Sequence, residues 1–305
     1  MSNKPMRLKP KGLLSGAPVI KREEKRTGFL QKAAAAAGRF FRGMGKALHS
    51  QTAGQLALCL ALAGVSVLYA GGLKDESITV VSHKRQLPVY SVARDDKVVS
   101  ISFDAAWGGD QTKPLLDILD KYDVKTTFFL VGFWVEKYPE LVKEIVARGH
   151  EIGNHSQNHM HMSQLNEAKI EEELRIMSDK VETITGVRPT LFRPPYGEYN
   201  DRVVLTSRAE GYEVVQWSID SLDWKNRGTA DIIKQCTTKV QSGDIVLFHN
   251  DAQYVLQALP TVIEHYQSLG YKIIPISQIL LNGETVIDVQ GKQHPVPTKT
   301  PAPAR

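Results

Sequence analysis

The sequence of 305 residues predicts an α/β domain on a parallel sheet of about seven strands, preceded by one transmembrane helix. From Lys97 onward, short β-branched or aromatic runs alternate with helical patterns, which indicates a parallel sheet with helices outside. A closed barrel and an open doubly wound sheet both fit this alternation. Upstream, no charged residue lies between His49 and Lys74, and that stretch can cross a hydrocarbon core of about 30 Å.

The basic charge of the chain is confined to its N-terminal end. Residues 1–52 contain 12 Lys and Arg against two Glu, a net charge of +10, whereas residues 53–305 contain 26 against 31, a net charge of −5. The overall basicity therefore does not indicate nucleic-acid binding. By the positive-inside rule, we expect a basic cytoplasmic tail at 1–52, a signal anchor in the cell membrane at 53–73, and an extracytoplasmic domain. A cleaved signal peptide is the alternative.

The elements of the domain follow in order along the chain. The expected strands cover residues 97–103, 125–131, 150–153, 190–192, 212–219, 244–248 and 272–276. Helices are expected at residues 139–148, 166–185, 229–240 and 255–270. Before the domain, which covers residues 97–283, we expect a polar stalk at 74–96. After it, we expect a Pro-rich tail at 284–305 that is extended or disordered.

Ionisable side chains follow the ends of five successive expected strands. They are Asp104, His155, Arg193, the pair Asp220 and Asp223, and His249. In a βα barrel, the carboxyl ends of all strands meet at one mouth, where catalytic residues lie. His155 and His159 are four residues apart, so on a helical turn both imidazoles face the same way. Two imidazoles can hold a zinc-like metal, but such a site needs a third protein ligand.

Five motifs in this order carry a family resemblance: "SFDAAWG", "HSQNH", "RPPYG", "DSLDW" and "VLFH". Together they resemble the polysaccharide deacetylases of carbohydrate esterase family 4, the NodB-homology domain, and in particular a cell-wall and sporulation-associated branch. The resemblance implies a distorted (β/α) barrel and a hydrolase that uses a bound divalent metal, often zinc. It implies removal of acetyl groups from chitin, peptidoglycan or xylan. We expect N-acetylated peptidoglycan or a related cell-wall glycan as the substrate.

The resemblance also implies catalytic roles for particular residues. Asp104 matches the general base that takes a proton from the metal-bound water, and Arg193 matches the residue that orients this base. The backbone N–H of Tyr196 matches a donor to the oxyanion. His249 matches the general acid that protonates the leaving amine, with Asp223 holding its ring. A carboxylate and an imidazole on opposite sides can divide the two proton transfers of amide hydrolysis.

The resemblance implies metal ligands and pocket walls as well. His155 and His159 match the two imidazole ligands of the metal. Trp224 and Leu247 match walls of the pocket that receives the acetyl methyl group. Trp107 is either a packing residue or a platform for a sugar ring.

The chain departs from the family at Ala105, where the usual residue is an acid that serves as the third metal ligand. Asp110, in the same loop, is one possible replacement, although it could simply cap the helix expected near residue 112. Asp104 could turn to the metal itself, and His161 is a less favoured candidate. The remaining alternative is an empty site in a glycan-binding pseudoenzyme with a morphogenetic or sporulation role.

Overall fold

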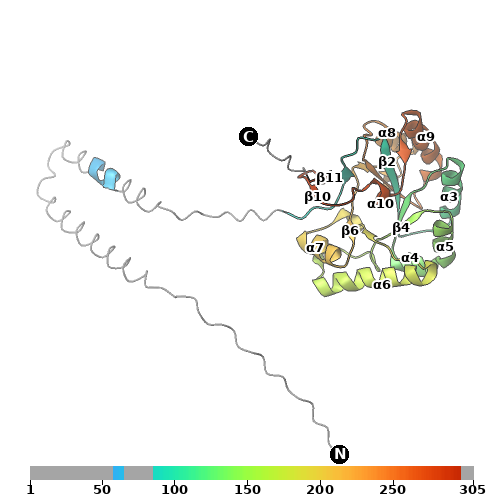
Figure 1. The fold of residues 1–305 in the computed structure, drawn as a ribbon, viewed down its shortest axis with the longest axis horizontal. Helices are drawn as coiled ribbons and strands as arrows, with labels where there is room; N and C mark the ends of the chain where they lie inside the picture. Colours follow the sequence, from blue (N-terminus) through green and yellow to red (C-terminus); the bar gives the residue numbers. More distant parts are fainter. Residues whose placement is uncertain (1–57, 65–84, 297–305) are drawn as a thin grey trace, which may run out of the picture. The chain divides into compact units, whose positions relative to one another are not determined.

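The computed structural model describes residues 58–64 and 85–296 (Figure 1). Residues 58–64 are helical, and the rest of the predicted membrane segment at 53–73 lies outside the described residues, as does the basic tail at 1–52. Across the described ranges, no helix has both the length and the apolar character that a membrane span requires. The predicted transmembrane helix therefore has no support from this part of the chain.

The domain is built on a parallel sheet in the strand order β6-β5-β4-β3-β2-β8-β7, with β9 paired to β2. Its strands are β2 (Val98–Ala105), β3 (Thr127–Leu130), β4 (Glu151–Asn154), β5 (Leu191–Phe192), β6 (Glu213–Val214), β7 (Ile219–Asp220), β8 (Ile245–His249) and β9 (Lys272–Ile273). All seven predicted strands are present. The one predicted over residues 212–219 divides into β6 and β7.

The sheet is curled into an incomplete barrel. β6 and β7 lie at opposite ends of the strand order, yet only residues 215–218 connect them. A flat sheet of seven strands would separate its edges by about 29 Å, whereas five residue steps span at most about 17 Å. The sheet must therefore bend back on itself, as a distorted barrel requires. Within the described residues no ladder joins β6 to β7, and Val89 pairs with Val215 beside this gap.

Helices cover the outside of the sheet (Figure 1). They are α3 (Thr112–Lys121), α4 (Gly132–Lys137), α5 (Pro139–Ala147), α6 (Glu167–Thr185), α7 (Asp201–Ala209), α8 (Thr229–Thr237), α9 (Val255–Ser268) and α10 (Ile276–Ile279). The ends of α6 follow from its sequence. The Asn166 side chain accepts a hydrogen bond from the Lys169 N–H, and Gly186 ends the helix with a φ of 75°.

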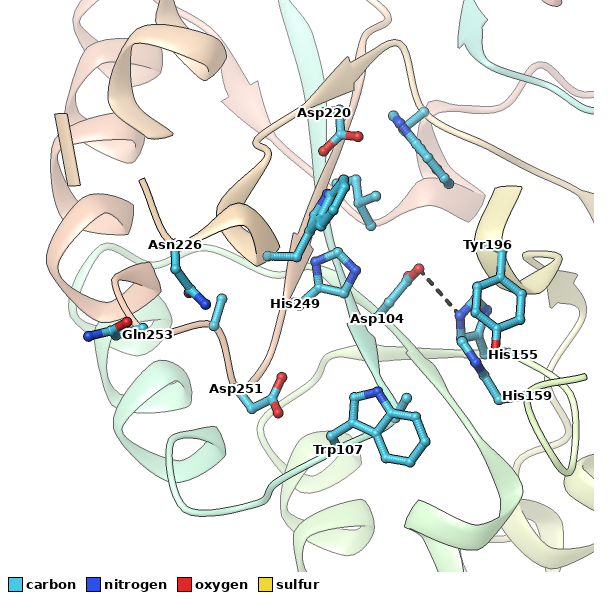
Figure 2. Close-up of a pocket in the computed structure, with 15 residues that line it drawn as sticks. Asp104, Trp107, His155, His159, Tyr196, Asp220, Asn226, His249, Asp251 and Gln253 are labelled. Atoms are coloured by element: carbon cyan, nitrogen blue, oxygen red, sulfur yellow. Dashed lines mark ion pairs between the residues drawn. The ribbon is translucent and has the colours of Figure 1, made fainter. Parts of the chain in front are cut away.

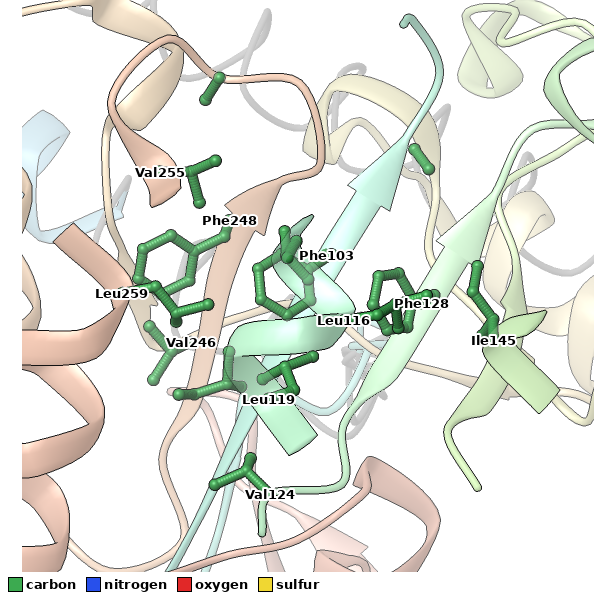
Figure 3. Packing of buried hydrophobic residues seen from close by; sticks show 14 of the residues in the cluster. Phe103, Leu116, Leu119, Val124, Phe128, Ile145, Val246, Phe248, Val255 and Leu259 are labelled. Atoms are coloured by element: carbon green, nitrogen blue, oxygen red, sulfur yellow. The ribbon is translucent and has the colours of Figure 1, made fainter. Parts of the chain in front are cut away.

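The main hydrophobic core lies between the sheet and these helices. Phe103, Phe128 and Phe248 come from three neighbouring strands and are fully buried, with ring centroids 5.1 Å apart for Phe103 and Phe128 (Figure 3). Leu116 of α3 and Leu259 of α9 belong to the same cluster. Side chains alternate between the two faces of a strand. The residues of β2 directly before and after Phe103 therefore point to the inside of the barrel.

The chain before and after the barrel differs from the prediction. β1 (Ser91–Val92) pairs with β11 (Lys292–Pro295), which pairs with β10 (Thr285–Ile287) in a hairpin. The predicted tail at 284–305 is therefore wrong for residues 284–296, and the predicted stalk at 74–96 is wrong for its last part, where Val89 and Val92 are fully buried. The hairpin strands are short and partly polar, so Pro-rich composition concealed them. Residues 74–84 and 297–305 lie outside the described residues.

Candidate functional site

A pocket of about 670 Å³ opens at the carboxyl ends of the barrel strands (Figure 2). Its lining residues are Asp104, Ala106, Trp107, His155, His159, Tyr196, Trp217, Asp220, Trp224, Asn226, Leu247, His249, Asp251, Ala252 and Gln253. The pocket thus collects predicted residues from five separate segments of the chain. Among them are the catalytic candidates Asp104, Tyr196 and His249. The predicted pocket residues Trp107, Trp224 and Leu247 also line it.

A buried ion pair forms one side of the site. Arg193 follows β5 and is fully buried, and its Nη1 donates a hydrogen bond of 2.7 Å to Asp104 Oδ1. The guanidinium is held by further hydrogen bonds from Nη2 to Ser102 Oγ and the Gln216 carbonyl, and it lies 4.1 Å from the Phe129 ring centroid. Burial alone would raise the pKa of Asp104, but the charge and hydrogen bond of Arg193, with contributions from His155 and His249, together outweigh it and hold the pKa below its usual range.

His155 presents a free nitrogen to this carboxylate. Its Nδ1 lies 2.7 Å from the Arg193 carbonyl oxygen, which can only accept, so Nδ1 carries the proton. Burial lowers the pKa of His155, and the neutral ring then directs the lone pair of Nε2 toward Asp104 Oδ2, 3.5 Å away. The dashed line in Figure 2 marks this contact. Two acceptors that face each other at this distance favour a cation or a polarised water between them.

The second side of the site is the pair of His249 and Asp223. His249 ends β8, and its Nδ1 lies 2.8 Å from Asp223 Oδ1, while its backbone N–H donates to Asp223 Oδ2. Burial alone would lower the pKa of His249, but the hydrogen bond and charge of Asp223 outweigh it and raise the pKa. His249 can therefore hold a proton that it can donate into the pocket.

Tyr196 and His161 form part of the rim. Tyr196 lies in the turn after β5 with a φ of 62°, a left-handed conformation that is uncommon for a residue with a side chain. Its ring stacks on His161, with centroids 4.4 Å apart and an angle of 16° between the planes. His161 Nδ1 lies 2.9 Å from Glu198 Oε2. His161 is thus engaged at the rim and does not line the pocket.

The divalent metal that the family resemblance implies needs at least three protein ligands. His155 and His159 offer two imidazoles, and His159 Nδ1 is buried without a hydrogen-bond partner. Ala105 is 1% exposed in the hydrophobic core and offers no donor. Asp110 is exposed, does not line the pocket and does not cap α3. In residues 58–64 and 85–296, no three His, Cys, Asp or Glu side chains are grouped to hold a metal ion, so the ligand set is incomplete.

Six residues that line the pocket were not predicted from the sequence, namely Ala106, Trp217, Asn226, Asp251, Ala252 and Gln253. Burial raises the pKa of Asp251. Asp251 lies two residues after His249, so its place just beyond a strand end was a usable signal. Trp217 lies inside a stretch that was predicted as one continuous strand, and this prediction concealed its position at the site.

Comparison with known proteins gives concordant similarities. The family model for polysaccharide deacetylase matches residues 91–215. A peptidoglycan-N-acetylglucosamine deacetylase of Bacillus cereus is 36% identical over 197 residues, which cover 63% of this chain and 92% of that protein. The peptidoglycan-N-acetylmuramic acid deacetylase PdaC of Bacillus subtilis is 32% identical over 62% of this chain and 40% of that protein.

Two solved structures have similar folds. The wild-type structure of a pseudoenzyme of carbohydrate esterase family 4 from Bacillus anthracis has a TM-score of 0.61 and 32% identity, and the match covers 63% of this chain and 68% of that chain. A peptidoglycan N-acetylglucosamine deacetylase in complex with a hydroxamate-type ligand has the same TM-score and 28% identity, covering 63% of this chain and 91% of that chain. Similarity therefore extends to a deacetylase and to a pseudoenzyme.

Proposed function

The chain belongs to the polysaccharide deacetylase family, and from this membership we propose that its barrel removes N-acetyl groups from peptidoglycan or a related cell-wall glycan. One observation carries the proposal. The Asp104–Arg193 pair and the His249–Asp223 pair both reach the same pocket, so a proton acceptor and a proton donor are available to one bound amide. The deacetylases among the relatives support peptidoglycan as the substrate class.

We assign the proton transfers to these two pairs. The ionised Asp104, oriented by Arg193, takes a proton from the water that attacks the acetyl carbonyl carbon. The backbone N–H of Tyr196 stabilises the resulting oxyanion. His249, held by Asp223, donates a proton to the amide nitrogen as the carbon–nitrogen bond breaks, which leaves acetate and a free amine.

The acetyl methyl group is assigned to an apolar wall. Trp224 and Leu247 both line the pocket, so an apolar surface is available to the methyl group there. The family's divalent metal, with zinc as the expected ion, would polarise the carbonyl and the water when bound. His155 and His159 are the only imidazoles that line the pocket besides His249, and the incomplete ligand set means that no step above depends on the ion.

A second candidate function is glycan binding without turnover. It is favoured by Ala105 at the usual third-ligand position, since a site with two imidazoles should bind zinc weakly. The similarity to a solved pseudoenzyme agrees with this candidate. The two candidates make opposite predictions about acetate release and the same prediction about glycan binding.

Acetate release from purified peptidoglycan by the full chain tests the proposal, with zinc, with cobalt and with a chelator. We expect release that is lost in His249→Gln and kept in His294→Gln, a control that breaks a histidine–aspartate pair on the β10–β11 hairpin. No release under any condition, from protein whose tryptophan fluorescence shows it to be folded, would exclude turnover on this substrate. Retained binding to peptidoglycan would then leave the second candidate.

The location of the domain is a separate proposal. We propose that residues 53–73 anchor the chain in the cell membrane and that the domain is extracytoplasmic, because the charge of the preceding segment is strongly positive. Extraction of cell membranes at high pH tests the anchor, since an integral protein stays with the lipid. Release of the chain by this treatment would contradict it.

A further inference from the structure

Trp107 presents an open aromatic face next to the candidate active site. Its side chain is 60% exposed although its ring contacts two others. The Phe133 ring lies 5.2 Å away at an angle of 31°, and the His159 ring lies 6.1 Å away, edge to face. An exposed indole that is supported by neighbouring rings loses little conformational entropy when a ligand covers its free face.

The turn that carries Trp107 is fixed by hydrogen bonds. The carbonyl oxygen of Gly108 accepts one from Trp134 Nε1 at 2.6 Å and another from Asn250 Nδ2 at 3.1 Å. Gly108 has a φ of 53°, and a Cβ added there would lie 2.9 Å from the Cβ of Asp251. The turn therefore packs closely against Asp251, and this packing sets the position of Trp107 relative to Asp251.

Asp251 places a carboxylate beside this indole. Its backbone carbonyl accepts a hydrogen bond of 2.9 Å from Gln111 Nε2, which fixes the residue, while its side chain lines the pocket. Figure 2 shows the carboxylate between His249 and Trp107. Among the described residues it forms no ion pair, and its own backbone N–H is the group that hydrogen-bonds to it, so the carboxylate can still accept hydrogen bonds from a ligand.

Trp224, which also lines the pocket, has a different environment. It is also exposed, but Lys225 Nζ lies 4.8 Å from its ring centroid and covers one face with a cation. Trp107 carries no such cation, and a carboxylate is its polar neighbour instead. A flat apolar ring beside an unpaired carboxylate matches a sugar, because a pyranose combines an apolar C–H face with hydroxyl donors at its edge.

We propose that Trp107 and Asp251 form a subsite for the sugar unit next to the N-acetylated one. The pyranose face lies on the Trp107 indole, and its hydroxyl groups donate to the Asp251 carboxylate. The pocket size agrees, since about 670 Å³ exceeds what an acetyl group requires and is in the range for larger ligands. This inference rests on the proposed function, because it takes the acetyl pocket as the neighbouring site. The chain therefore selects oligosaccharides of at least two sugar units over monosaccharides.

Binding of N-acetylglucosamine and of its β-1,4-linked tetramer to the full chain tests the subsite, by calorimetry in parallel with acetate release. We expect the tetramer to bind about tenfold more tightly than the monomer, as one charge-assisted hydrogen bond and one stacked face allow. Trp107→Ala and Asp251→Asn should each remove most of this preference. Trp107→Phe keeps an aromatic face and should keep most of the preference. Asp95→Asn and Val289→Ala, both at exposed positions outside the pocket, serve as controls.

The outcomes separate the subsite from the proposed function. Tetramer preference that depends on Trp107 and Asp251, without acetate release, would support the subsite and contradict turnover. Equal affinity for monomer and tetramer, or a preference that survives both substitutions, would overturn the subsite whatever the acetate assay shows. Failure of the folded wild-type chain to bind either sugar would overturn it as well.

Discussion

Arg193→Met tests whether the buried ion pair stabilises the barrel as well as the site. Methionine keeps an apolar stem but removes a guanidinium that makes three hydrogen bonds from a fully buried position. Asp104, with a side chain that is 7% exposed, would be left as a buried carboxylate without its cation. Loss of one partner of such a pair typically costs about 3–5 kcal/mol. We expect a loss of this size in the free energy of unfolding at pH 7.

The loss should depend on pH in a definite direction. In the wild type the pKa of Asp104 is lowered, so its ionisation contributes stability above the unfolded pKa of about 3.9, and this contribution is lost as the pH falls through the folded value. In Arg193→Met, burial is no longer outweighed by the guanidinium, so the pKa of Asp104 rises. The variant then takes up a proton at a higher pH. The difference in stability between wild type and variant should therefore shrink between pH 7 and pH 4.

Urea unfolding followed by tryptophan fluorescence measures both effects, because the four tryptophans of the chain all lie in the barrel domain. Arg188→Met is the matched control, since Arg188 is 42% exposed and pairs with Asp179 and Glu182 at the surface. Such pairs contribute about 1 kcal/mol or less. The reasoning is refuted if the two variants lose equal stability at pH 7. It is also refuted if the loss in Arg193→Met is as large at pH 4 as at pH 7.

Three other substitutions address separate features. Asp223→Asn removes the group that raises the pKa of His249, so the alkaline limb of acetate release should move to lower pH. An unmoved limb would contradict the assigned pair. Ala105→Asp buries a carboxylate, so in chelator it should lower the free energy of unfolding by about 3 kcal/mol. Zinc should restore part of this stability in thermal unfolding. Equal zinc stabilisation of the wild type would show that the wild-type ligand set is already complete. Gly243→Ala places a Cβ 1.8 Å from the Val92 carbonyl oxygen and should lower the free energy of unfolding by at least about 2 kcal/mol. Gly211 has the same φ of 86° but no neighbour within 4 Å, so Gly211→Ala should cost about 1 kcal/mol. Equal losses in urea unfolding would contradict the steric argument.

The sequence predicted the barrel because its strong signals are local. Strands such as β3 and β8 are continuous apolar runs, and α6 has both caps and an apolar stripe, so each element agrees with its own residues. β6 and β7 have two residues each, and the apolar stretch that contains both resembles one longer strand. The β10–β11 hairpin was missed for the opposite reason. Its strands depend on pairing with β1, which is about 200 residues away in the sequence, and no local pattern encodes that contact.

The candidate site was predictable where position after a strand determined it. Asp104, Arg193 and His249 follow this rule, and the structure places Asp104 and His249 in the pocket with Arg193 behind Asp104. Asp110 shows where this rule fails, because it lies two residues beyond Gly108 in the loop and its side chain is already outside the pocket. Asp251 was missed because its contacts with the turn of Trp107 join segments that are about 140 residues apart in the sequence. The packing of Gly108 against it and the hydrogen bond from Gln111 Nε2 to its carbonyl bring the two together.

The buried pair of Asp104 and Arg193 has an evolutionary consequence. If both residues are required for the barrel to fold, a lineage that had ceased to turn over substrate would still be under selection to retain them. Their presence in a related sequence would then report on foldability and only weakly on activity. Position 105 differs, because alanine meets every packing requirement there. The family's usual acid can therefore be replaced by alanine at this position without loss of the fold. Surveys that sort active from inactive relatives should therefore give more weight to position 105 than to the ion pair.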